Sequence, residues 1–177
     1  MQGSNTNVIF DELGRGIVII NDIRFVGRQN INWNDVEVYL KDYINTNYEV
    51  LDSADVIYIG SDAPSEIKGS EDTRRLKGTY AKAKANAVTE LPLLIQYAGN
   101  KRWQENYKLK HGTDAGFGWY RFTTRFAMPV YDNDGDLLRY NIFRIEMLVR
   151  HSSDGRLYLY DLVNVKKEKE AGTPSGQ

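Results

Sequence analysis

The chain has 177 residues, of which 41% are hydrophobic and 12% aromatic, and this composition indicates one globular domain rather than a disordered chain. It contains no cysteine, which excludes disulfides, thiolate catalysis and cysteine-ligated zinc. The formal net charge is −1, so any site for an anion must be a local patch rather than a property of the whole surface.

The ends of the chain differ in composition from the middle. The opening letters MQGSNTN lack the charged start and apolar stretch of a signal peptide, so we expect residues 1–15 to be a flexible or expression-derived N-terminus. Residues 16–168 are expected to form a single α+β domain, and residues 169–177 a disordered tail. No apolar run reaches the length of a membrane span, so we expect no membrane partner.

The first two thirds of the chain mix strand and helix patterns. Residues 16–27 predict a strand or a small hairpin, and residues 55–60 a second short strand. Apolar side chains at helical spacing predict an amphipathic helix over residues 33–44. Residues 73–91 are rich in helix formers, with Gly78 as a weak point, and Pro92 opens a short buried helix. The candidate caps are Asn32 or Asn34 for the first helix and Ser70 or Asp72 for the second.

The last third predicts three consecutive strands, over residues 119–131, 137–151 and 156–167. The turn-forming sequences DNDGD and SSDG separate them, which is typical of an antiparallel meander. The fold class expected is therefore α+β, with N-terminal helices packed on an antiparallel sheet that ends in a three-stranded meander.

Alternation along two of these strands places most of the charge on one face. The side chains on that face are Arg121, Thr123, Arg125, Arg144 and Glu146. They fit either a basic groove that binds phosphate or a solvated face with cross-strand ion pairs. The third strand adds either Tyr158 and Tyr160 or Asp161, and the register of the strands stays open.

Three other features invite a functional interpretation. His111, in the glycine-bearing stretch KHGTDAGFGWYRFTTRF, could act as a general acid or base, or be a surface histidine. Lys84, with Lys82 and Arg102, could contact phosphate or belong to a solvated helix face. Tyr120 could orient a substrate or pack against the sheet.

A family resemblance runs from about Gly16 to Glu168 and is carried by four stretches within it. The most individual pieces are KAKANA, the KH that precedes GWYR, and the closing YLYDLVNVKKE. They resemble a module found in large polyvalent proteins of phages and mobile elements and in polymorphic toxins. That module is similar to the barnase, EndoU, colicin and RelE group of ribonucleases. The resemblance implies a barnase/RelE-like fold, the BECR fold.

The resemblance also implies an activity, metal-independent cleavage of RNA, a hydrolase-type reaction in which the 2′-hydroxyl attacks the adjacent phosphate. It implies catalytic roles for His111, Glu146 and Arg121. It further implies substrate binding by six residues: Arg125, Arg144, Thr123, Tyr120, Tyr158 and Lys84. No metal and no cofactor is expected.

The same resemblance leaves an alternative open, a non-catalytic nucleic-acid-binding or protein-interaction module. The expected partners are RNA, with tRNA as one candidate, and an immunity protein. The expected site of action is the cytoplasm, after delivery as part of a larger secreted or phage-borne protein. The sequence does not determine the oligomeric state.

Overall fold

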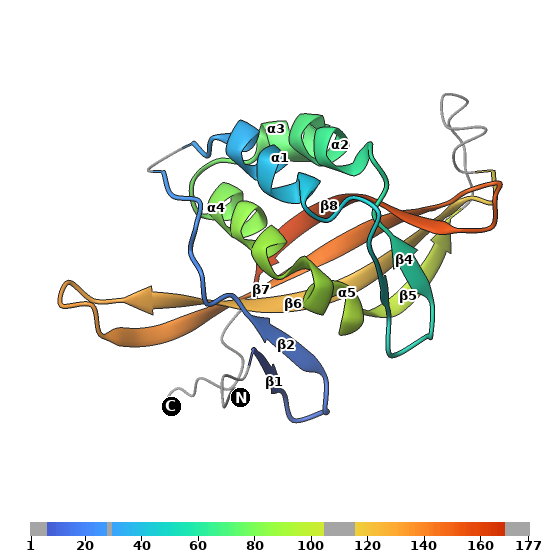
Figure 1. The fold of residues 1–177 in the computed structure, drawn as a ribbon. Helices are drawn as coiled ribbons and strands as arrows, with labels where there is room; N and C mark the ends of the chain where they lie inside the picture. Colours follow the sequence, from blue (N-terminus) through green and yellow to red (C-terminus); the bar gives the residue numbers. More distant parts are fainter. Residues whose placement is uncertain (1–6, 28–29, 105–115, 169–177) are drawn as a thin grey trace.

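A computed structural model describes residues 7–27, 30–104 and 116–168 (Figure 1). Its centre is a sheet in the order β1-β2-β6-β7-β8-β4-β3, with β5 paired to β6. The strands are β1 (Val8–Phe10), β2 (Gly16–Ile19), β3 (Asn47–Glu49), β4 (Val56–Tyr58), β5 (Gly99–Gln104), β6 (Trp119–Tyr131), β7 (Leu137–His151) and β8 (Leu157–Lys167).

The three long strands β6, β7 and β8 form the predicted antiparallel meander, which is confirmed. Gly135 and Gly155 lie in the two connecting turns with φ of 86° and 89°, a conformation that glycine adopts without steric cost. The turn chemistry of the sequence therefore located both hairpins correctly.

The expected fold class, with N-terminal helices packed on an antiparallel sheet, is wrong. The sheet is mixed and curls into a half-barrel, with 39% of residues in strands against 27% in helices, so it is not a set of N-terminal helices on an antiparallel sheet. The N-terminal half supplies strands at both sides of the meander. There β2 runs parallel to β6 and β4 runs parallel to β8. The barnase/RelE-like plan is not the observed one.

Short strands account for much of this difference. Val8–Phe10, inside the segment expected to be flexible, pairs with β2, and Asn47–Glu49 pairs with β4. Gly99–Gln104, expected to follow a helix end, pairs with β6. Three to six residues are too few for a period-2 pattern to stand out, so the sequence did not indicate these strands.

The helices cover one face of the long strands (Figure 1). They are α1 (Trp33–Lys41), α2 (Ala63–Gly69), α3 (Glu71–Arg75), α4 (Gly78–Ala87), the 3₁₀ turn η1 (Val88–Glu90) and α5 (Leu91–Gln96). Asn32 caps α1 and Ser70 caps α3, each through a side-chain oxygen that accepts a backbone N–H. The helix expected over residues 73–91 is interrupted at Gly78, where φ is +60°.

The core lies between these helices and the sheet. Phe122, Phe126 and Phe143 are at most 1% exposed, and the rings of Phe126 and Phe143 stack at 5.5 Å. Because these side chains face the helices, the alternate side chains of β6 and β7 face the other side of the sheet. Among the described residues, no helix has the length and apolar character needed to cross a membrane.

Candidate functional site

The sheet face away from the core carries a transverse row of three cations. Arg125 on β6 lies directly opposite Arg144 on β7, and Arg144 lies opposite Lys166 on β8. Neighbouring strands are about 4.8 Å apart, so the three side chains start from positions that span only about 10 Å. Like charges directly opposite each other destabilise a sheet unless something compensates them. The row is therefore an electrostatic feature that needs a counter-charge.

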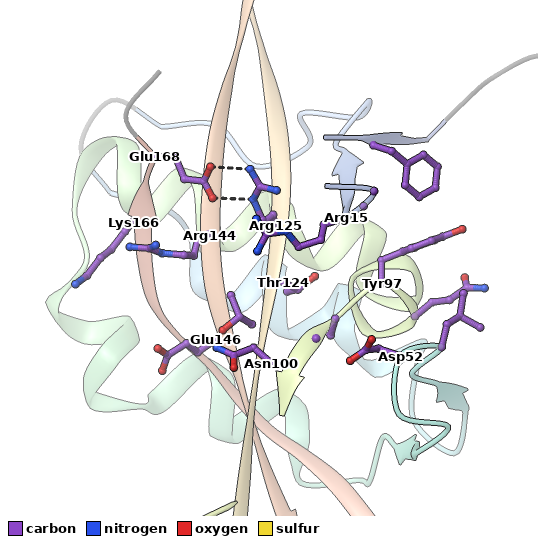
Figure 2. A pocket seen from close by; sticks show the side chains of 18 of the residues that line it. Arg15, Asp52, Tyr97, Asn100, Thr124, Arg125, Arg144, Glu146, Lys166 and Glu168 are labelled. Atoms are coloured by element: carbon purple, nitrogen blue, oxygen red, sulfur yellow. Dashed lines mark hydrogen bonds and ion pairs between the residues drawn. The ribbon is translucent and has the colours of Figure 1, made fainter. Parts of the chain in front are cut away.

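This row forms one wall of a pocket of about 1450 Å³, which we call the sheet-face pocket (Figure 2). Its charged lining residues are Arg15, Arg102, Arg125, Arg144, Lys166 and Lys167, against Asp52, Glu146 and Glu168. Cations thus outnumber carboxylates two to one, in a chain whose total charge is −1. The pocket is therefore a local basic patch on a protein whose overall charge is close to zero.

Part of this positive charge is neutralised within the protein. Arg125 donates to both oxygens of Glu168, at 2.8 and 2.9 Å, and to Asp11 at 2.6 Å. The hydrogen bond with Glu168, followed by that with Asp11, raises the pKa of Arg125 above its ordinary value. Backbone N–H donation from Arg15, together with the bond from Arg125, lowers the pKa of Asp11.

Glu146 lies on the same face of β7, two residues after Arg144, within a second group of polar side chains. Its Oε1 accepts from Arg121 at 2.9 Å and from Asn164 at 3.0 Å, and its Oε2 lies 3.5 Å from Arg102. Arg102 also donates to the hydroxyl of Thr123 at 3.1 Å. A carboxylate with this many donors is fixed in orientation, so it supplies a stationary negative charge beside the cation row.

Three pocket cations differ from the others: Arg144, Lys166 and Lys167. Within the described part of the chain none of the three makes an ion pair or a side-chain hydrogen bond, and all three side chains are exposed. Figure 2 shows Arg144 and Lys166 side by side, with Arg144 between Lys166 and the Arg125–Glu168 pair. Their guanidinium and ammonium groups are the donors that the pocket offers to an external anion.

The structure brings together five of the expected site residues on this face: Arg121, Thr123, Arg125, Arg144 and Glu146. It does not bring Tyr120 there. That ring lies on the helix side, 5.7 Å from the ring of His151 and under the ammonium of Lys101. His111 lies outside the described residues.

Tyr158 and Lys84 also lie away from the pocket lining. Tyr158 lies on β8 opposite Tyr58 of β4; its hydroxyl donates to Asp154, and its ring lies 5.9 Å from that of Tyr58. Lys84 is fully buried, with its ammonium 3.0 Å from Asp72 and 3.1 Å from Asp161. Neither expectation for Lys84, a phosphate contact or a solvated helix face, is correct, because the ammonium has no access to solvent.

Sequence reasoning missed Lys166 and Asn164 as lining residues of the pocket. The sequence shows the polar–apolar–polar alternation of Asn164, Val165 and Lys166, whose side chains are exposed, buried and exposed. Because β8 contains bulges, this alternation could not be extended from the rest of the strand to predict which face of the sheet Asn164 and Lys166 occupy. No group of three or more His, Cys, Asp or Glu side chains is arranged to hold a metal ion among the residues described.

Comparison with known proteins identifies no relative: no protein-family model, no curated protein and no solved structure matches the chain. The family resemblance stated from the sequence therefore stays a prediction. The sheet-face pocket is consequently the basis on which a function can be assigned.

Proposed function

We propose that the protein binds nucleic acid, with single-stranded RNA as the first ligand to test, through phosphates held in the sheet-face pocket. The observation that carries the proposal is the pair Arg144 and Lys166, two neighbouring cations without a carboxylate partner in the described part of the chain. Arginine offers a planar fork of donors that matches a phosphate, and lysine adds a point charge.

The arrangement supports backbone binding rather than base reading. Three cations cross three strands in one row, and a polyanion lying along that row would neutralise several of them at once. Such binding releases counterions, so affinity falls as salt concentration rises. The low net charge of the chain fits a localised footprint.

The first test is a fluorescence anisotropy titration of a labelled single-stranded RNA at several salt concentrations. We expect affinity to fall roughly tenfold between about 50 and 200 mM salt, because neutralising about two or three phosphates gives that slope. Arg144→Ala and Lys166→Ala should each weaken binding and reduce the logarithmic salt slope by about 0.7.

Arg139→Ala is the matched control, because Arg139 is an exposed arginine of the same strand that does not line the pocket. It should leave affinity unchanged. Equal losses in Arg139→Ala and Arg144→Ala would place the binding elsewhere, and no salt-dependent binding by the wild type would end the proposal.

A second candidate function, cleavage of the bound RNA, is supported by the oriented carboxylate of Glu146 beside Arg121 and Arg102. One carboxylate and several cations are a minimal set for attack by a 2′-hydroxyl on its phosphate. The test is incubation of RNA in EDTA with wild type, Glu146→Gln and His111→Ala. Fragments from the wild type alone would support a ribonuclease. Intact RNA with retained affinity would leave a binding module.

A further inference from the structure

Arg125 is the only pocket cation in the described residues that two separate carboxylates engage at hydrogen-bond distance. Glu168 takes the Nε and Nη2 donors in a bidentate pair, and Asp11 takes Nη1. The two carboxylates come from opposite ends of the described chain. Asp11 lies in the β1–β2 turn, and Glu168 follows the last strand. All three side chains are partly exposed, at 20–22%.

The donors that hold these carboxylates are the donors that a phosphate would use. A guanidinium binds a carboxylate and a phosphate with the same parallel pair of N–H groups. A phosphate on the neighbouring Arg144 would lie one strand away from Arg125, so the next phosphate of a polymer comes within reach of it. Glu168 and Asp11 therefore occupy a place that a bound polyanion would take.

The backbone around both carboxylates is anchored independently of Arg125. The N–H of Glu168 donates to the carbonyl of Ile142 at 2.8 Å. The backbone of Asp11 donates to the carbonyl of Arg15 at 3.0 Å and accepts the N–H of Gly14 at 2.9 Å. Its carboxylate is also held, through Oδ1, by the backbone N–H groups of Leu13 and Arg15. Because none of these bonds involves Arg125, Glu168 can leave Arg125 by rotation of its side chain, and Arg125 can rotate away from the fixed Asp11, without unfolding either segment.

Charge explains why the free protein would hold this arrangement. Arg125 faces Arg144 directly, and the repulsion between them is relieved while carboxylates neutralise Arg125. An anionic ligand supplies the same neutralisation from outside. The two states exchange one set of counter-charges for another, so the equilibrium between them is set by ligand affinity.

We propose that Glu168 and Asp11 form a latch on Arg125 that the anionic ligand of the sheet-face pocket displaces when it binds. The inference rests on the proposed function and adds its regulation: two carboxylates of the protein compete with the ligand for the donors of Arg125. Partly exposed ion pairs of this kind are weak, so the latch lowers the affinity for RNA without abolishing it.

The experiment measures RNA affinity by anisotropy for the full chain carrying Glu168→Gln, with Asp11→Asn as a second variant. Glu168→Gln should bind about two- to fivefold more tightly than wild type, the factor that corresponds to losing one partly exposed ion pair. Asp52→Asn is the matched control, because Asp52 lines the same pocket and makes no ion pair in the described part of the chain. Circular dichroism checks that each variant is folded.

If the latch acts through Arg125, the effect of Glu168→Gln should disappear when Arg125 is removed. In an Arg125→Met background, Glu168→Gln should give no more tightening than Asp52→Asn does. Equal gains from Glu168→Gln and Asp52→Asn in the wild-type background would mean that only pocket charge matters, and would overturn the latch. Unchanged or weaker binding by Glu168→Gln would overturn it too, while wild-type binding would leave the proposed function standing. Failure of every variant to bind RNA would remove both.

Discussion

Among single residues, Lys84 shows how a charge can be buried in a helix of mostly small side chains. On α4, Lys84 lies within an unbroken run of buried residues from Ala83 to Ala87, three residues after the buried Ala81. The small side chains of this run were visible in the sequence, but helix-forming lysines are usually solvated. Only the carboxylates of Asp72 and Asp161, brought from elsewhere in the chain, make the burial tolerable.

Lys84→Met should therefore be strongly destabilising. Removing the ammonium leaves two carboxylates without their cation, and breaking a buried pair costs about 3–5 kcal/mol of unfolding free energy. Chemical denaturation measures the loss. Lys82→Met, two residues away and only half-buried, is the control and should change stability by less than about 1 kcal/mol. Similar losses in the two variants would contradict the buried network.

The cost of Lys84→Met should also depend on pH. Desolvation already raises the pKa of Asp161, and Lys84 opposes that rise. Without Lys84 the pKa of Asp161 in the folded state rises further above its unfolded value. Such a group binds its proton more tightly when folded, so its contribution to stability is present at low pH and is lost as pH rises through the folded pKa. The destabilisation should therefore be larger at about pH 7 than at about pH 4.5.

At the scale of elements, alternation predicted the faces of β6 and β7 and did not settle β8. The first two strands pair without interruption from Trp119 to Val130, so period 2 holds along them. The pairing of β8 with β7 shifts register twice, and Asn164 at one shift has φ of +58°. A bulge adds a residue on one strand and reverses the alternation beyond it. The open choice between Tyr158 and Asp161 reflects this geometry.

The junction between α3 and α4 provides a test at the same scale. Gly78 has φ of +60°, and no atom lies within 4 Å of the place that a Cβ would take, so strain rather than crowding opposes a side chain there. Gly78→Ala should cost about 1–2 kcal/mol of unfolding free energy. Gly69 in α2 has equally open space and no positive φ, so Gly69→Ala should be neutral or slightly stabilising. Thermal denaturation of both variants measures the two effects. Equal effects would contradict the explanation that the positive φ at Gly78 opposes a side chain.

At the scale of the whole molecule, the sheet is closed at its sides by N-terminal strands. β2 pairs with β6 across more than a hundred residues of sequence, and it carries the buried Ile17, Val18 and Ile19. β1 covers the outer edge of β2 and leads into the turn that holds Asp11. Residues 1–15 are thus part of the folded unit from Val8 onward, rather than only a flexible N-terminus.

Deleting residues 1–15 should therefore lower stability. The deletion exposes the edge of β2, and an uncovered edge strand promotes association as well as unfolding. We expect the Tm to fall by roughly 4–8 °C, which corresponds to about 2 kcal/mol in a chain of this size. Asp11→Asn removes the ion pairs with Arg125 and Arg15 but keeps β1, and it should lower the Tm much less. An unchanged Tm after the deletion would show that β1 contributes nothing to the fold.

The sequence by itself determined the meander, its two turns, the charged face of β6 and β7 and the candidate caps of two helices. Each of these follows from contacts within a few residues or from period 2 along a long strand. Only the tertiary structure decided the parallel pairings, the burial of Lys84 and the meeting of Asp11, Arg125 and Glu168. These depend on segments far apart in the chain, and local patterns carry no information about which distant partner supplies a hydrogen bond or a counter-charge.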